Sequence, residues 1–201
     1  MHKELFSAVA IALTFAIFIP YIRAIARGKT KPHVFSWIIW AIGTLVVFFA
    51  QLADGAGVGA WPIGISACIT FYIAHLAYRK RGDASITRSD WLFLLAALST
   101  LPIWFITSNP LWAVVVLTLV DIIGFGPTVR RSYANPYDES VSFFALASVR
   151  NLLVVLALEH YSMTTVLFPA AVGAACVMLT AFLLYRRKCT GGLRRKTFYT
   201  P

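Results

Sequence analysis

The sequence predicts an all-α polytopic membrane protein with seven transmembrane helices. Of its 201 residues, 59% are hydrophobic and only 13% are charged, and the mean hydropathy is +0.76, far from the composition of soluble domains. A helix needs roughly 20 mostly apolar residues to cross a hydrocarbon layer of about 30 Å. Seven segments meet this requirement, namely 4–22, 34–53, 59–78, 91–107, 111–129, 141–159 and 163–185.

These segments exclude several other classes of protein. A soluble helical bundle does not fit, because the segments are apolar on nearly every face and carry Trp, Tyr and basic residues at their ends. Segment 4–22 is kept as the first helix, since Pro20 and a basic loop follow it where a cleaved signal peptide would have small residues. No nucleotide-binding loop, metal-ligand spacing or nucleophile constellation is present, so neither an enzyme, a metal site nor a cofactor is expected.

The distribution of basic residues predicts the orientation in the membrane. Sixteen of the 18 Lys and Arg residues lie in three loops and the C-terminal tail, on one side of a seven-helix chain. By the positive-inside rule, the N-terminus is outside and the C-terminus is cytoplasmic. The net charge of +10 then reflects topology and the anionic lipid beside these loops, so the expected partner is the lipid bilayer and not nucleic acid. On the opposite side, solvation accounts for Asp54, Glu159 and His160 without a function.

A shift of 107 residues aligns the two halves of the chain. It places "FIPYIR" (18–23) on "FGPTVR" (125–130), and "WPIGISACITFYIAHLAYRKR" (61–81) on "FPAAVGAACVMLTAFLLYRRK" (168–188). Two matches at one shift predict two copies of a three-helix unit. Because a single connector helix separates them, both copies cross the membrane in the same direction, as parallel repeats do. The predicted divisions are 1–82 (first repeat), 83–110 (connector helix), 111–188 (second repeat) and 189–201 (basic cytoplasmic tail).

This 3+1+3 arrangement, with a proline near the cytoplasmic end of the first helix of each repeat, resembles the SWEET and PQ-loop (MtN3-like) transporter superfamily. The resemblance is carried by "IPYIRAIARGKTKPHVFSW" in one repeat and "GPTVRRSYANPYDESVSF" in the other. The sequence departs from the family where Tyr21 and Thr128 replace the glutamine after each proline, and where the asparagines of the third helices are missing. The resemblance implies a divergent prokaryotic-type transporter in a bacterial inner membrane, with a homo-oligomer left open and sugar less strongly implied as the substrate.

Two charged residues lie in the middle of predicted helices. Asp121 is about ten residues into its helix and Arg150 about nine, so at about 1.5 Å per residue both lie near the membrane midplane. An unpaired charge there costs about 2.5 to 3.5 kcal/mol. Two hypotheses follow: a static ion pair that joins the two helices, or a pair that borders a central substrate cavity together with Asn151. In the first repeat, Thr14 and Thr44 take the equivalent places.

The stretch "VLTLVDIIGFGPTVRR" (116–131) also predicts a hinge. Pro127 removes a backbone hydrogen bond, and Gly124 and Gly126 lower the cost of bending, so the cytoplasmic end of this helix is expected to move. Pro20 holds the matching position of the first repeat. A permanent packing kink is the alternative.

Aromatic residues complete the predicted substrate site. Trp37 and Trp40 are three residues apart and therefore on one helix face, where two indoles can stack on a flat ring or on the apolar face of a sugar. An aromatic belt at the membrane interface is the alternative for both. Tyr72 is a further polar candidate in the third helix. The predicted site consists of Asp121, Arg150, Asn151, Trp40, Trp37, Thr14, Thr44 and Tyr72.

These features predict transport of a small polar solute, sugar-like or another small metabolite, around a midplane site between the repeats. The alternative is a non-transporting receptor or assembly factor on the same seven-helix scaffold, resembling the KDEL receptor. A cavity that opens alternately to both sides would favour transport, and a cavity that opens to one side would favour the receptor.

Overall fold

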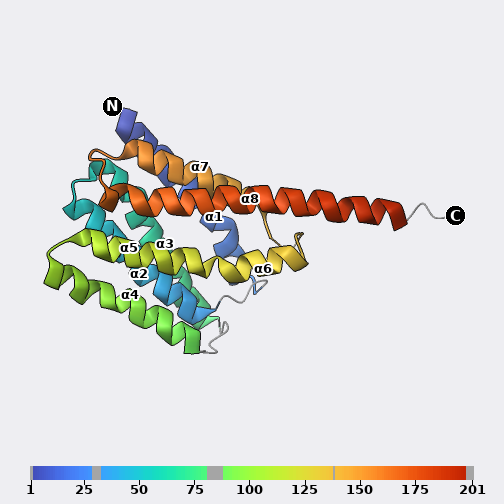
Figure 1. The fold of residues 1–201 in the computed structure, drawn as a ribbon, viewed down its shortest axis with the longest axis horizontal. Coiled ribbons are helices and arrows are strands. Elements are labelled where there is room, and N and C mark those ends of the chain that lie inside the picture. The colour runs from blue at the N-terminus through green and yellow to red at the C-terminus, as the bar shows by residue number, and fades with distance from the viewer. Residues whose placement is uncertain (1, 29–32, 81–87, 138, 198–201) are drawn as a thin grey trace.

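The computed structural model describes residues 2–28, 33–80, 88–137 and 139–197, and in these ranges the chain is helical (Figure 1). The elements are α1 (His2–Ala26), α2 (Val34–Ala53), the 3-10 helix η1 (Gly57–Ala60), α3 (Trp61–Arg79), α4 (Arg88–Thr107), α5 (Pro110–Gly124), α6 (Gly126–Ala134), α7 (Val141–Ala157) and α8 (Met163–Thr197). Each predicted apolar segment coincides with one helix, apart from 59–78, which forms the end of η1 and α3, and 111–129, which forms α5 and the start of α6.

Several of these helices have the length and composition of membrane spans. His2–Ala26, Val34–Ala53, Gly57–Arg79 and Met163–Thr190 are long and apolar enough to cross a membrane, and Trp91–Thr107, Pro110–Gly124 and Val141–Ala157 are shorter apolar helices. Large apolar side chains also face outward, such as Phe105 at 87% and Ile106 at 79% exposure, which suits lipid better than water. The structure therefore fits a helical integral membrane protein, as the composition predicts.

The helices pack in two similar groups. α3 packs against both α1 and α2, and α8 packs against both α5 and α7. The pairs α1–α7 and α2–α5 join the groups, while α4 packs against α5 and α2. We call α1–α3 the first unit and α5–α8 the second unit. In Figure 1, α5 and α8 of the second unit run side by side along the long axis of the molecule.

The two ends of this helix bundle differ in charge. The turn end contains the start of α1 and the turns that join α2 to α3 and α7 to α8, on the left of Figure 1. The basic end is opposite, where α1 and α3 end. Basic side chains described there are Arg23, Arg27, Arg79, Lys80, Arg88, Arg186, Arg187 and Lys188. The outside position of the turn end stays a prediction from the positive-inside rule.

Small residues let the helices approach closely. A Cβ atom on Gly64 would lie 2.7 Å from the ring of Phe48. A Cβ atom on Gly59 would lie 2.7 Å from the backbone of Leu158, so η1 and the end of α7 almost touch. Close packing of this kind favours small residues between membrane helices. The main core around these contacts includes the fully buried side chains Val47, Ala50, Ala60, Val114, Val154 and Leu158.

The break predicted near Pro127 lies slightly earlier in the chain. α5 ends at Gly124, Phe125 stands at the junction with φ −71° and ψ −18°, and α6 begins at Gly126. Pro127 is thus the second residue of a new helix, where its missing N–H costs little. α1 instead continues through Pro20 to its end, because no glycine beside that proline weakens the helix further.

We expect Gly59→Ala to destabilise the protein, because the added methyl group meets backbone atoms of Leu158 that cannot move aside. Overpacking of this kind costs about 1 to 3 kcal/mol. Gly126→Ala is the matched control, since a Cβ there meets nothing within 4 Å, and it should leave stability unchanged or slightly higher. Thermal unfolding of both variants in one detergent measures the difference. Equal unfolding temperatures would mean that η1 is not held tightly against Leu158.

Candidate functional site

Arg150 of α7 lies in the interior between the two units, and only 8% of it is exposed. Its Nε donates a hydrogen bond to Thr14 Oγ1 of α1 at 3.1 Å, and its Nη2 donates to the carbonyl oxygen of Pro62 of α3 at 2.7 Å. Its Nη1 donates to Asn151 Oδ1 at 3.1 Å. One guanidinium group therefore bonds to oxygens on three helices, and these oxygen dipoles stabilise its charge.

Two of these acceptors are oriented by bonds of their own. Thr14 Oγ1 donates to Ala10 O at 2.8 Å within α1, and Asn151 Nδ2 donates to Ala147 O at 2.8 Å within α7. A threonine that donates to its own helix in this way keeps lone pairs free to accept a bond. Thr14 belongs to the buried face of α1, and α1 packs against α3 and α7. The sequence of α1 thus presents an acceptor to the buried arginine.

The ion pair predicted between Asp121 and Arg150 is not formed. Both residues lie in the described part of the chain, and no ion pair joins them there. Arg150 obtains neutral acceptors instead, one for each of its three guanidinium nitrogens, without a second buried charge. Asp121 is partly exposed and makes no hydrogen bond or ion pair with a described residue.

Asp121 faces the contact between the two units. It shares one face of α5 with Leu117 and Gly124, at a spacing of three or four residues. Leu117 meets α2, and a Cβ on Gly124 would lie 3.8 Å from Nε1 of Trp40 on α2. Cys176 on α8 lies close to both Asp121 and the guanidinium group. Asp121, which is partly exposed, therefore lies on the side of α5 that faces α2 and α8.

The two predicted tryptophans have different surroundings. The rings of Trp37 and Trp40 lie edge to face, with centroids 5.3 Å apart. Trp37 also contacts Phe18 and Tyr21 of α1, at 6.4 and 5.3 Å between ring centroids, so it packs between α1 and α2. Trp40 keeps 36% of its surface exposed. Its indole is thus available for contact. It lies beside Gly124 of α5, which is one helical turn from Asp121.

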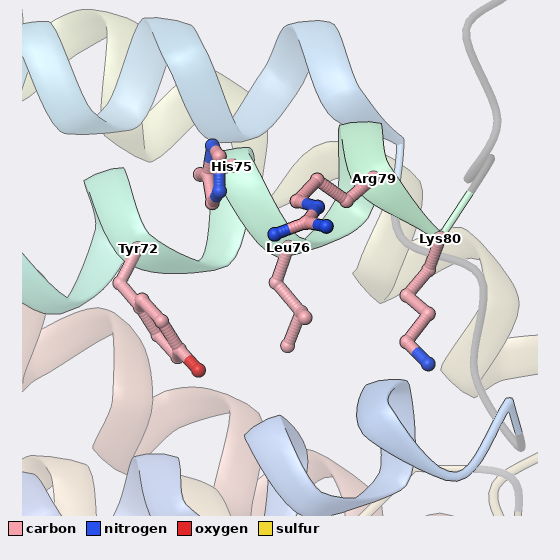
Figure 2. A pocket seen from close by; sticks show the side chains of 5 residues that line it. All are labelled: Tyr72, His75, Leu76, Arg79 and Lys80. Carbon is pink, nitrogen blue, oxygen red and sulfur yellow. The ribbon is translucent and has the colours of Figure 1, made fainter.

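Two predicted site residues lie apart from these groups. Thr44 of α2 is partly buried, and its hydroxyl makes no hydrogen bond with the described residues. Tyr72 of α3 lines a groove at the basic end and is 52% exposed (Figure 2). The structure therefore brings Arg150, Asn151 and Thr14 together and places Asp121 near Trp40, but it leaves Thr44 and Tyr72 outside both groups.

Polar residues that the sequence analysis leaves without a function meet at the turn end. The Asp54 carboxylate, after α2, accepts a hydrogen bond from Ser162 Oγ, before α8. His160 Nδ1 lies 3.6 Å from the same carboxylate oxygen and 2.9 Å from the Asp54 carbonyl oxygen. We call these three residues, together with Gln51, Glu159 and Thr165, the turn-end network.

The remaining members of the network also join the two units. Glu159 Oε1 accepts from the backbone N–H of Val58 at 3.1 Å, and the backbone N–H of Glu159 donates to Ala56 O at 3.0 Å. Gln51 Nε2 donates to Thr165 O at 2.7 Å. The 107-residue repeat could have predicted that these residues meet, because it places the α2–α3 and α7–α8 turns at the same end of the bundle.

Within the described ranges of the chain, the hydrogen bonds between the two units are unevenly distributed. Those that involve side chains of described residues lie at the turn end or at Arg150. At the basic end, Arg186 and Arg187 bond to backbone oxygens of residues 133–139, within the second unit. No hydrogen bond between described residues joins the units at that end. The described bonds thus hold the units together at one end and in the middle.

This arrangement is suited to binding a polar molecule. Asp121 offers two acceptor oxygens, and Trp40 offers an apolar ring and one N–H donor. Among the described residues, no group of three or more His, Cys, Asp or Glu side chains is placed to hold a metal ion. Comparisons with protein-family models, curated proteins and solved structures found no match for this chain.

We expect Thr14→Val to destabilise the protein by about 1 to 3 kcal/mol, because the Nε–H of Arg150 loses its acceptor in the interior. Thr14→Ser keeps the hydroxyl and should recover most of the loss. Thr44→Val is the matched control, since it removes a threonine hydroxyl that has no described partner, and should change stability by less than about 0.5 kcal/mol. Denaturant unfolding of the three variants tests this. An equal loss at Thr14 and Thr44 would contradict the role of Thr14 as an acceptor.

Proposed function

We propose that this protein transports a small polar solute by alternating access, with the two units moving against one another around a site near the membrane midplane. The observation that carries the proposal is the turn-end network, whose hydrogen bonds join the two units at one end of the bundle. The turn-end network closes one side of the site, and the basic end is the side that opens. With the N-terminus outside, as the positive-inside rule predicts, this state is closed to the outside.

The packing of the helices supports two repeats of one three-helix unit. Under the 107-residue shift, α1 corresponds to α5 with α6, α2 to α7, and α3 to α8. In each unit the third helix packs against the other two, and the contacts α1–α7 and α2–α5 exchange under this correspondence. An approximate two-fold axis along the membrane normal has this effect. The proposal therefore includes the 3+1+3 arrangement of SWEET and PQ-loop proteins, with α4 as the connector.

In this proposal, Asp121 and Trp40 contact the solute. The Asp121 carboxylate has no partner among the described residues, so a hydroxyl or ammonium group of a solute can donate to it. Trp40 can stack on a ring or on the apolar face of a sugar. Arg150 and Asn151 are bonded to each other and hold the surrounding helices in position, so they shape the site.

The break between α5 and α6 is the proposed hinge. α6 is attached to α8, because Arg186 Nη2 donates to Tyr133 O at 2.7 Å and its guanidinium lies 4.1 Å from the centre of the Tyr133 ring. α5 also packs against α8, but unlike α6 it packs against α2 and α4 as well. Relative motion of these groups would bend the chain between Gly124 and Gly126, where the glycines lower the cost.

A thermal-shift screen against sugars, nucleosides, amino acids and vitamins is expected to find a solute that raises the unfolding temperature, because a ligand that binds only the folded state stabilises it. Asp121→Asn should weaken binding by about 10- to 100-fold, as loss of a hydrogen bond to a charged group predicts. Its unfolding temperature without solute should not fall, since an unpaired carboxylate is costly inside the bundle. Thr44→Val should bind normally. Equal binding by wild type and Asp121→Asn would exclude Asp121 from the site.

Closing the turn end permanently is expected to stop transport. The Cβ of His160 lies 3.6 Å from the position of a Cβ on Gly55, within the range of about 3.5 to 4.5 Å that suits a disulfide. In a variant with Cys68, Cys176 and Cys189 replaced, Gly55→Cys with His160→Cys should therefore cross-link on oxidation. Uptake of the solute into proteoliposomes should be lost on oxidation and return on reduction.

The single cysteine variants are the controls, since Gly55 has a φ of +76° that strains any other residue. Continued uptake by fully cross-linked protein would refute opening at the turn end. Binding without uptake, in both the oxidised and the reduced protein and in wild type, would favour the receptor alternative.

A further inference from the structure

A groove of about 350 Å³ lies along α3 at the basic end and is lined by Tyr72, His75, Leu76, Arg79 and Lys80 (Figure 2). Figure 2 shows Tyr72, Leu76 and Lys80 extending to one side of α3, with the guanidinium group of Arg79 between them and the ring of His75. The residues recur every three or four positions, so they share one face over more than two turns. Leu76 is partly buried and the others are exposed.

The two basic side chains of this groove have no partner among the described residues. Arg79 and Lys80 make no ion pair or side-chain hydrogen bond with the described residues. They stand at the end of Gly57–Arg79, a helix of membrane-spanning length, at the level where a bilayer has its phosphate groups. An anion at the membrane surface would supply the partner that the protein does not.

The second unit closes the equivalent face. Under the 107-residue shift, the groove residues correspond to Leu179, Phe182, Leu183, Arg186 and Arg187 of α8. The three apolar residues pack in a core cluster with α7 and Phe125. The two arginines donate to backbone oxygens of residues 133–139 at 2.6 to 2.9 Å. The same face is therefore sealed in one unit, whereas in the other it is open, polar and positively charged.

We propose that this groove binds the headgroup of an anionic phospholipid from the leaflet at the basic end. Arg79 is suited to two parallel bonds with phosphate oxygens, and Lys80 adds a second positive charge. The hydroxyl of Tyr72 and the ring of His75 supply further donors deeper along α3. Leu76 offers apolar contact to the glycerol and the first methylenes of the acyl chains. This combination of charged, polar and apolar groups fits a lipid better than it fits a free phosphate ion.

Native mass spectrometry of the detergent-solubilised full chain tests the proposal. Phosphatidylglycerol and phosphatidylcholine with the same acyl chains are added in turn. Wild type should bind phosphatidylglycerol at one saturable site. Arg79→Gln with Lys80→Gln should bind it about 30-fold more weakly, since each basic side chain near an anionic lipid contributes about fivefold. Arg88→Gln with Lys188→Gln removes the same charge from exposed positions of α4 and α8 and should bind as wild type does.

A second variant tests the groove without changing its charge. Tyr72→Leu with His75→Phe copies the residues of the second unit and should weaken phosphatidylglycerol about fivefold, as the loss of about one hydrogen bond predicts. If the Arg79→Gln with Lys80→Gln variant does not fold, the Tyr72→Leu with His75→Phe variant alone tests whether the groove binds the lipid. Equal weakening by both charge-removing pairs, or no weakening by the groove variants, would overturn the site. Competition by inorganic phosphate as effective as that by the lipid would overturn the lipid assignment.

Discussion

The hydrogen bonds of one guanidinium group hold the interior of this protein together. Arg150 is a buried, positively charged residue between apolar helices, where an unsatisfied charge costs about 2.5 to 3.5 kcal/mol. Thr14, Asn151 and the Pro62 carbonyl offset that cost from α1, α7 and α3. Apolar contact has little directional preference, whereas hydrogen bonds require a defined geometry. The relative position of three helices from two units therefore depends on this network.

The same requirement for satisfied polar groups makes Asp121 distinctive. At the turn end, Asp54, Glu159 and Ser162 all find partners across the two units. Asp121 lies nearer the centre of the bundle, where a partner is worth more, yet the described residues supply none. In the proposed function, this unsatisfied carboxylate reduces the stability of the folded state and is retained because it binds the solute. The partly exposed side chain of Trp40, which lies near Asp121, is consistent with that interpretation.

Features with local causes were predictable from the sequence, and features that depend on a distant partner were not. Hydropathy predicts the apolar helices, and two glycines before Pro127 predict the break after α5. The partners of Arg150 were missed because charge attraction favoured Asp121, whereas no sequence pattern marks the Pro62 carbonyl as an acceptor. Helical spacing also assigns Tyr72 to one face of α3, but it does not predict which helix or solvent region that face contacts. Packing decides this, and it places Tyr72 in a groove remote from the arginine.

α8 connects the two ends of the molecule without interruption. Thr165, in its first turn, accepts a bond from Gln51. Arg187 donates to the carbonyl oxygens of Pro136 and Glu139 about 33 Å farther along, at about 1.5 Å per residue. Between these points α8 is flanked by α5 and α7. One continuous helix therefore joins the turn-end network to the basic end of the second unit, and a displacement of either end is passed to the other along its backbone. Mechanical communication along the whole length of the bundle then needs only the rigidity of a single helix.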